Sequence, residues 1–254
     1  MNDKALLSLV CKLVAISQLP PCNALADSVL FRQNTFVPLR DPSMTPPPPS
    51  DTSILTIGHS NLELAEFLKV LVTHQVKSLC DVRSRPGSFR FPQFNREPLE
   101  ACLAIAGIHY EFMGEPLGGR PSDPRAYHAD GVVNYEARRR AADFRAGIDR
   151  ALELSRASNI ALMCAEEDPL ECHRFLMICP ALLERGVTPS HIRRAGELES
   201  QREAEDRLLK LHDLGAFDSG SLFASERGAA IQDALRLQAK EFAFRASAEA
   251  IEYF

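Results

Sequence analysis

The sequence predicts an α/β fold of three layers, in which helices flank a mainly parallel sheet of about five strands. From Ile54 onward, short apolar runs alternate with longer amphipathic stretches, a pattern typical of parallel strands joined by crossover helices. The run at 159–164 is almost continuously apolar, as expected for a strand buried on both faces. The 254-residue chain is 45% apolar and 25% charged, which is ordinary for a globular domain and excludes a fibrous or wholly disordered protein.

The expected strands and helices follow from apolar spacing and from residues that start or stop helices. We place strands at 54–57, 76–82, 108–113, 159–164 and 188–193. Ser60 and Glu63 form a capping box, which predicts a helix beginning after Ser60. Asp168 and Pro169 should start another helix, which Pro180 kinks and Gly186 ends. Further helices are expected at 96–106, 134–157, 197–212 and 227–252.

The two ends of the chain depart from this alternating pattern. Residues 45–50 are Thr-Pro-Pro-Pro-Pro-Ser, which favours an extended polyproline conformation. We interpret residues 1–50 as a disordered leader or as an over-long gene start, with Met44 as the true initiator. The expected organisation is therefore a leader at 1–50, an α/β domain at 51–212 and a helical C-terminal extension at 213–254.

Charge and cysteine content restrict the class of protein further. The net charge of -5 argues against a protein that coats nucleic acid, although it can conceal a local basic patch. No run approaches the ~18 apolar residues of a membrane-spanning helix, so we expect no membrane contact. The seven cysteines are odd in number and contain no Cys-x-x-Cys, so we expect reduced thiols in a cytoplasmic protein. Nothing in the sequence indicates an oligomeric state.

Polar residues gather where the expected strands end. Ligands of parallel α/β sheets bind outside the carboxyl ends of the strands, so these positions are the candidate site. They comprise Gly58, His59 and Ser60 after the first strand, Asp81, Arg83 and Arg85 after the second, Gly118 and Gly119 after the third, and Cys164, Glu166, Cys172, His173 and Arg174 after the fourth.

The loop after the second strand has a basic and aromatic character. Residues 83–96 contain four arginines and no acidic residue, with Phe89, Phe91 and Phe94 between them. Arginine interleaved with phenylalanine can bind phosphates and stack on bases. The phenylalanines can equally pack beneath the loop. The loop makes an anionic partner, such as a nucleotide or nucleic acid, plausible despite the acidic chain.

The residues around the fourth strand carry the most reactive side chains. Glu166 is a candidate acid, base or carboxylate nucleophile, and His59 is its candidate proton-transfer partner. Cys172 lies at a predicted helix start, where the helix dipole lowers a thiol pKa; the alternative is a small buried apolar residue. Cys164, Cys172, His173 and His59 could form a mixed zinc site, but Cys-x7-Cys-His matches no common zinc motif, so we expect neither metal nor cofactor.

Four ordered motifs at these strand ends carry a family resemblance. They are Thr56-Ile57-Gly58-His59-Ser60, Asp81-Val82-Arg83-Ser84-Arg85-Pro86, Leu117-Gly118-Gly119, and Cys164-Ala165-Glu166 followed by Cys172-His173-Arg174. Over residues 54–212 the chain resembles the bacterial and archaeal family called domain of unknown function 488. The resemblance implies an α/β domain with a shared polar site, and it implies no particular reaction.

Two classes of function are compatible with these residues. The first is an enzyme, a hydrolase or an enzyme that cleaves glycosidic bonds, acting on a phosphate-bearing substrate through Glu166 and His59. Arg83 and Arg174 would hold the anion, and Asp81 would orient one of them. The second is a non-catalytic module that binds nucleotide or nucleic acid. We favour the enzyme, because a binding surface has no need of His, Glu and Cys together. A rhodanese-like thiol reaction at Cys164 or Cys172 is a further alternative, although acidic residues after Cys164 would raise its pKa.

Overall fold

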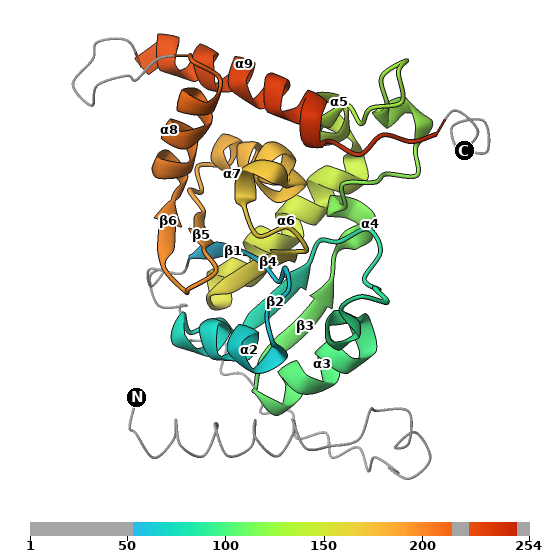
Figure 1. Cartoon of the computed structure of the whole chain (residues 1–254), viewed down its shortest axis with the longest axis vertical. Helices are drawn as coiled ribbons and strands as arrows, with labels where there is room; N and C mark the ends of the chain where they lie inside the picture. Colours follow the sequence, from blue (N-terminus) through green and yellow to red (C-terminus); the bar gives the residue numbers. More distant parts are fainter. Residues whose placement is uncertain (1–52, 215–223, 248–254) are drawn as a thin grey trace, which may run out of the picture. The chain divides into compact units, whose positions relative to one another are not determined.

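The computed structural model describes residues 53–214 and 224–247, and it has a sheet of six strands flanked by helices (Figure 1). The strand order is β3-β2-β4-β1-β5-β6, and the neighbours from β3 to β5 are parallel. This confirms the predicted α/β class and mainly parallel sheet. The strands are β1 Ile54–Gly58, β2 Ser78–Asp81, β3 His109–Phe112, β4 Ile160–Cys164, β5 Ser190–Ile192 and β6 Leu198–Ser200.

The sixth strand was not predicted. β6 pairs antiparallel with β5, and it occupies the residues that we expected to begin a charged helix. That helix begins at Gln201 instead, where Ser200 and Glu203 form a capping box. The interpretation of residues 1–50 concerns a segment outside the described residues. The helix expected at 227–252 is present at Ala224–Phe242; its expected continuation is wrong for residues 243–247, which are not helical, and lies outside the described residues beyond 247.

The helices lie close to most of the expected positions. Their bounds are α2 Leu64–Thr73, α3 Arg96–Ile105, α4 Gly114–Leu117, α5 Tyr135–Arg140, α6 Ala142–Ala157, α7 Cys179–Glu184, α8 Gln201–Leu211 and α9 Ala224–Phe242, with 3-10 turns at Pro92–Phe94, Pro124–Ala126 and Pro169–Glu171 and a π-helical turn at Arg174–Ile178. In the part of the chain that the structure describes, none of these helices is long and apolar enough to cross a membrane.

Two helix starts and one continuous helix were predicted wrongly. Ser60 does not cap α2, whose first flanking residue is Glu63; the Leu62 amide binds the His59 carbonyl instead, closing a turn before the helix. The expected helix at 134–157 is divided at Ala141, which is extended (φ -66°, ψ 142°). Asp168 caps only a 3-10 turn.

The helix after β4 contains a π-helical turn immediately before Pro180. Proline has no N–H to give to the carbonyl four residues earlier. The chain widens by one residue here, and the Cys179 amide binds the Arg174 carbonyl. The predicted irregularity at Pro180 is therefore present as a wider turn.

The layers follow from alternation of side chains along the strands. Ile54, Cys80 and Leu162 belong to the buried cluster that includes Phe144 of α6. The side chains between them point to the opposite face of the sheet, as strand geometry requires. Figure 1 shows α2 and α3 on one side of the sheet and α6 and α7 on the other. α9 packs on α8 and on the turn Pro169–Glu171, with Ala234 buried.

The strand order creates a switch point between β1 and β4. From β1 the chain runs through α2 toward β2, and from β4 it runs through α7 toward β5 on the other side. Gly58 pairs with Cys164 at the carboxyl ends of these two strands. Ligands of open α/β sheets bind at such a point, so the fold directs attention to residues 58–60 and 164–168.

Because Gly58 has no side chain, the backbone of the loop after β4 can approach it more closely than it could approach any other residue type. A Cβ atom on Gly58 would lie 1.6 Å from the Glu166 carbonyl oxygen. We predict that Gly58→Ala destabilises the protein by about 1–3 kcal/mol, because backbone must move to admit the methyl group. Urea unfolding followed by circular dichroism measures the loss.

The matched control is Gly228→Ala in α9. No atom lies within 4 Å of a Cβ there, so alanine should leave stability unchanged or raise it by up to about 1 kcal/mol. Equal unfolding midpoints for Gly58→Ala and the natural chain would contradict the close approach.

Candidate active site

A cavity of about 500 Å³ opens beyond the carboxyl ends of β2 and β4. Cys164, Glu166, Cys172 and His173 line it together with Arg83, Arg85 and Gly119. The C-terminal extension contributes Phe242 and Phe244 to the same lining. The cavity thus brings together side chains from loops far apart in the sequence.

Four reactive groups meet within this cavity. Cys164 Sγ and Cys172 Sγ lie 2.9 Å and 3.2 Å from the same oxygen, Glu166 Oε2. The two sulfurs lie 3.6 Å and 3.7 Å from His173 Nδ1. Cys164, Cys172 and His173 are buried, with exposed fractions of 4%, 2% and 8%. We call these four residues the thiol–carboxylate cluster.

The orientation of His173 is fixed from outside the cluster. Its Nε2–H donates a hydrogen bond of 3.0 Å to the Val82 carbonyl, so Nδ1 faces the sulfurs. A Cβ on Gly119 would lie 2.9 Å from the His173 ring. Gly119 therefore lets the third strand-end loop pack directly against the imidazole, which accounts for glycine at this position.

The groups of the cluster strongly perturb one another. Burial raises the pKa of Glu166, and the neighbouring Cys172 raises it further. Burial alone would raise the pKa of Cys172, but hydrogen bonding with Cys164 and the charges of Arg174 and His173 hold it well below its usual value. The same hydrogen bonding raises the pKa of Cys164. Burial opposes a charge on His173, yet the Cys172 thiolate raises its pKa.

Arg174 holds the loop that carries Glu166 rather than an anion. Its guanidinium is fully buried and donates hydrogen bonds of 2.6 Å to the carbonyls of Glu166 and Glu167. The geometry therefore does not support the predicted role of Arg174 in binding substrate. Gly58 is likewise covered by the Glu166 carbonyl and forms the support of the loop instead of contacting a ligand.

Only one of the three acidic residues after Cys164 faces the cluster. Glu167 binds Arg193 at 3.1 Å, and Asp168 binds Arg207 at 2.8 Å. These ion pairs turn both side chains toward β5 and α8. Of the three acidic residues expected beside Cys164, only Glu166 therefore contacts it.

A second buried group lies behind the cavity around Asp81. Its carboxylate accepts hydrogen bonds from Arg83 Nε and Nη2 at 2.9 Å and 2.6 Å and from the Tyr110 hydroxyl at 2.8 Å. Arg83 Nη1 then reaches His59 Nε2 at 3.2 Å. Asp81 orients Arg83 as predicted, and Arg83 lines the cavity.

His59 is a structural member of this group rather than a proton-transfer residue. Its Nδ1–H donates to the Ser60 carbonyl at 2.9 Å, and its ring stacks on Phe94 with centroids 4.3 Å apart. Burial lowers the pKa of His59 to about 4, assisted by the charge of Arg83. Both ring nitrogens are occupied and His59 does not line the cavity. The predicted catalytic role of His59 is therefore not supported by the geometry.

The remaining predicted residues divide between cavity and frame. Arg85 lines the cavity and is exposed. Gly118 packs against Ser84 and the Gly114 carbonyl, and Ser60 has a left-handed backbone (φ 45°) outside the cavity lining. Both therefore shape turns and do not contact a ligand there.

The basic loop combines both expected arrangements of its phenylalanines. Phe94 is buried beneath it, whereas Phe89 is fully exposed. Arg90 lies over the Phe91 ring and Arg96 over the Phe112 ring, at 5.5 Å and 4.9 Å. Phe89 thus remains available for stacking on a partner.

Several cavity residues were not predicted from the sequence. Tyr135 is buried, and burial together with Cys172 and Cys164 raises its pKa. Arg120 is exposed at the cavity and lies 4.7 Å over the Phe244 ring. The Phe244 carbonyl accepts the Val133 amide at 3.0 Å, so backbone pairing fixes the extension over the cavity. The sequence contains no motif that signals this pairing.

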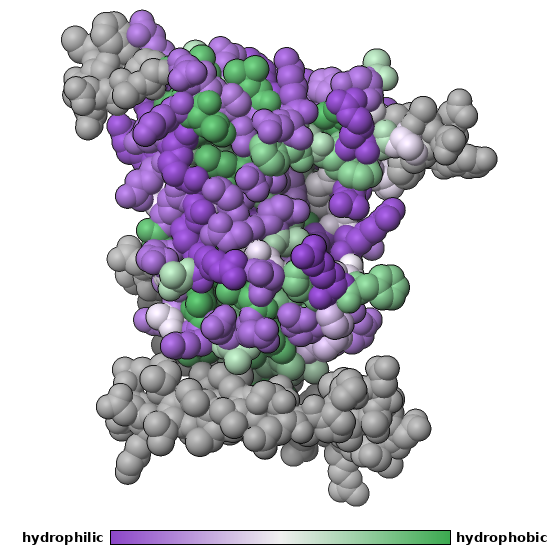
Figure 2. Space-filling model, in the orientation of Figure 1, coloured by the Kyte–Doolittle hydropathy of each residue, from purple (hydrophilic) through white to green (hydrophobic). Residues whose placement is uncertain are grey.

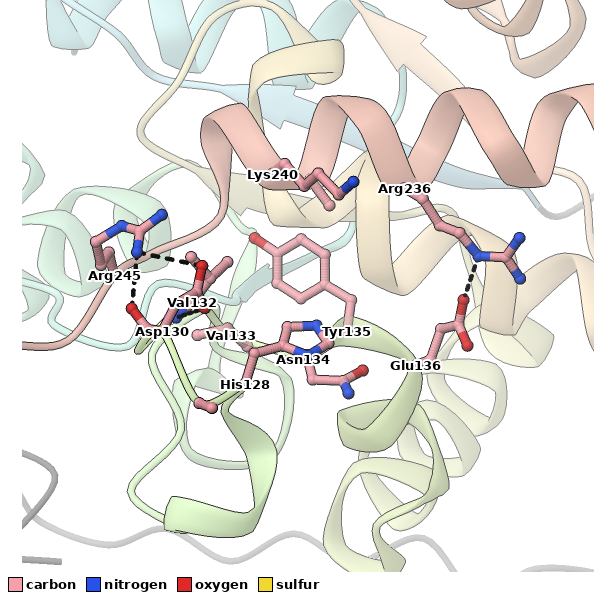
Figure 3. A pocket seen from close by; sticks show the side chains of 12 residues that line it. His128, Asp130, Val132, Val133, Asn134, Tyr135, Glu136, Arg236, Lys240 and Arg245 are labelled. Carbon is pink, nitrogen blue, oxygen red and sulfur yellow. Dashed lines mark hydrogen bonds and ion pairs between the residues drawn. The ribbon is translucent and has the colours of Figure 1, made fainter.

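A larger cavity of about 870 Å³ lies on the other side of Tyr135 (Figure 3). Arg236 binds Glu136 at 2.8 Å, and Arg245 binds Asp130 at 3.3 Å. Figure 3 shows these pairs along its rim. Because the pairs tie the C-terminal extension to residues 130–136, we regard this cavity as part of the packing between them.

The fold and cavity define an open α/β domain with a polar site at the carboxyl ends of β2 and β4, next to the switch point. Residues 63–178 match the family model described as domain of unknown function DUF488. This part of the chain is similar to that family, and the resemblance seen in the sequence motifs is confirmed for it. The match includes the motifs from Asp81 to Arg174, whereas the Thr56–Ser60 motif precedes it. No curated protein and no solved structure matches the chain.

The buried Asp81 carboxylate should be essential to the frame of the site. We predict that Asp81→Asn destabilises the protein by about 3–5 kcal/mol, because Arg83 is left as a buried charge without its partner. Tyr110→Phe removes one hydrogen bond to the same carboxylate and should cost about 1–3 kcal/mol. Urea unfolding of both variants gives the comparison, and a smaller loss for Asp81→Asn than for Tyr110→Phe would contradict it.

Proposed function

We propose that this protein is an enzyme that cleaves a phosphoester or glycosidic bond of a phosphate-bearing substrate, such as a nucleotide or a nucleic acid. The observation that carries this proposal is the position of Glu166. Its carboxylate contacts two cysteine sulfurs within a cavity that also presents Arg85 and Arg120. A binding surface needs no such combination of a carboxylate with two buried thiols and a buried imidazole.

Glu166 is the proposed acid–base group. Desolvation of its carboxylate beside the sulfurs raises the pKa of Glu166 and favours the protonated form. Because Glu166 is exposed to the cavity, its carboxyl group can exchange a proton with a reacting atom. His173 replaces His59 as the candidate partner of Glu166. Glu166 and His173 both line the cavity, and His173 Nδ1 faces the Cys164 sulfur. The His59 ring instead contacts Arg83. The acid–base role assigned to Glu166 is therefore retained with a different partner.

Arg85 and Arg120 are the proposed anion-binding residues. Both are exposed at the cavity, and no partner carboxylate is found for either among the described residues. Arg83 adds positive charge, although Asp81 neutralises much of it. Arginine suits phosphate because its planar fork donates several hydrogen bonds.

Exposed Phe89 favours a second candidate function, a module that binds nucleic acid through the basic loop. An exposed aromatic ring beside Arg85 and Arg90 could stack on a base. A thiol reaction is now associated with Cys172 more than with Cys164, because the pKa of Cys172 is lowered and that of Cys164 is raised. Cys80, Cys164, Cys172 and Cys179 are buried free thiols, which supports a location in the reducing cytoplasm.

The decisive experiment begins with a thermal-shift screen of nucleotides, sugar phosphates and short oligonucleotides. The ligand that stabilises best is then tested for conversion. We predict that Glu166→Gln lowers turnover by roughly 10²–10⁴-fold, because it removes the acid–base group. Glu171→Gln is the matched control, since Glu171 lines the same cavity and is exposed like Glu166, whereas the sulfur contacts are made by Glu166, and it should retain activity within a few-fold.

Two results would contradict the proposal that the protein is an enzyme. One is full turnover in Glu166→Gln, and the other is the failure of every phosphate-bearing compound to stabilise the protein. Binding that is retained in Glu166→Gln, with no conversion by the natural chain, would instead favour the binding module.

Salt dependence tests the anion-binding residues separately. We predict that Arg85→Ala and Arg120→Ala each weaken oligonucleotide binding and each lower the slope of log affinity against log salt by roughly 0.7–0.9, because one phosphate contact is lost. Arg156→Ala, on the exposed face of α6, should leave affinity and slope unchanged. Identical slopes in all three variants would remove Arg85 and Arg120 from phosphate binding.

A further inference from the structure

We infer that Cys164, Cys172 and His173 form a zinc site whose fourth position opens into the cavity. The first observation is their mutual distance. All three ligand atoms lie within 4.8 Å of one another, and all three residues are buried. They come from the end of β4 and from the start of the helical segment that follows it, so the loop between them brings the ligands together.

The distances fit one tetrahedral ion. Zinc binds sulfur at about 2.3 Å and imidazole nitrogen at about 2.0–2.1 Å, which places those atoms roughly 3.5 Å apart at the tetrahedral angle. The observed distances from His173 Nδ1 to the two sulfurs are 3.6 Å and 3.7 Å. A single ion can therefore bind all three atoms with little movement of the chain.

The surroundings of His173 are those of a metal-binding histidine. Its other ring nitrogen donates to the Val82 carbonyl at 3.0 Å, which leaves Nδ1 as the atom that faces the two sulfurs. Metal-binding histidines almost always use their second nitrogen in this way, because the bond fixes the ring and makes it a better ligand. His59, which we had considered as a fourth ligand, binds Ser60 and Arg83 instead.

The donor atoms indicate which kind of ion the site would take. Two thiols lie 2.9 Å and 3.2 Å from the Glu166 carboxylate, and His173 Nδ1 faces both sulfurs. Two thiolates with one imidazole favour a thiophilic ion such as zinc over magnesium or calcium.

The site has the form of a catalytic rather than a structural zinc centre. Structural sites are closed by four protein ligands, whereas catalytic sites have three and keep a position for water. Glu166 lies beside the sulfurs and lines the cavity, so it can hydrogen-bond a water bound at the fourth position.

The reaction that follows is a hydrolysis, and it rests on the proposed function. The charge of the ion would favour the carboxylate form of Glu166, which takes one proton from the zinc-bound water, and the resulting hydroxide would form a bond to the electrophilic atom of the substrate. The bond from that atom to the leaving group breaks, and its electron pair remains with the leaving group. The leaving group takes the proton from Glu166, so the net change consumes one water molecule.

The test is zinc binding by the full chain. Protein stripped with a chelator is titrated with zinc in competition with a chromophoric chelator, and the natural chain should bind one equivalent. Cys164→Ser, Cys172→Ser and His173→Gln should each weaken binding by at least about 100-fold, while Cys102→Ser should bind as the natural chain does. Uptake below about 0.1 equivalents by the folded natural chain would overturn the site.

Cobalt substitution provides a readout that does not depend on stability. The cobalt-loaded natural chain and Cys102→Ser should show thiolate-to-cobalt charge-transfer absorption, which Cys164→Ser and Cys172→Ser should reduce while circular dichroism shows them folded. Unchanged absorption in both folded cysteine variants would overturn the assignment.

Glu166→Gln separates the metal site from the proposed function. It should retain zinc affinity within about 10-fold and lose turnover. A loss of zinc affinity as large as that of the cysteine variants would make Glu166 a ligand and overturn the open fourth position. Turnover by a metal-free natural chain would overturn the zinc centre and leave the proposed enzyme standing. One bound zinc with unchanged turnover in Glu166→Gln would overturn the proposed function and leave the zinc site standing.

Discussion

The site depends on the fully buried guanidinium of Arg174. Its two hydrogen bonds to the Glu166 and Glu167 carbonyls hold the loop after β4 against β1, in space that exists only because residue 58 is glycine. Because these carbonyls are held in place, the Glu166 side chain points toward the two sulfurs. Burial raises the pKa of Cys172, while hydrogen bonding with Cys164 and the charge of the same arginine lower it. Arg174 therefore contributes to both the shape and the electrostatics of the thiol–carboxylate cluster.

Two buried charged groups of different kinds support the cavity from either side of the sheet. The Asp81–Arg83 pair is satisfied within the protein, since every oxygen of Asp81 receives a hydrogen bond and Arg83 also binds the Phe94 carbonyl. The thiol–carboxylate cluster is different, because three of its four members are acids that contact one another. A satisfied pair stabilises a frame, while a cluster of acids needs a proton or a cation to share. For this reason we propose chemistry for the second group and a structural role for the first.

The sequence predicted the fold class and the region of the site for physical reasons that are local. Apolar runs mark buried strands, and parallel topology places their carboxyl ends at one edge, so Asp81, Cys164 and Glu166 were expected near one another. The individual roles depend on partners that local patterns cannot show. Ser60 has the spacing of a cap, but the Leu62 amide is already bound by His59. His59 and Arg174 have the chemistry of site residues, and burial against Arg83 and against backbone carbonyls gives them structural roles instead. The extension that brings Phe244 over the cavity is held by backbone pairing, which has no side-chain signature. On the described face in Figure 2, hydrophilic residues predominate and apolar residues form small separate patches, so the buried cavity remains the strongest indication of function.

In the proposed site, the two thiols and the imidazole bind one ion at the reacting centre. X-ray absorption spectroscopy at the zinc edge of the loaded full-length protein measures the ligands of that ion. We expect a first shell with two sulfur atoms at about 2.3 Å and lighter atoms, one of them an imidazole nitrogen, at about 2.0–2.1 Å. A shell of oxygen and nitrogen alone, or one of four sulfurs, would rule out this set of ligands.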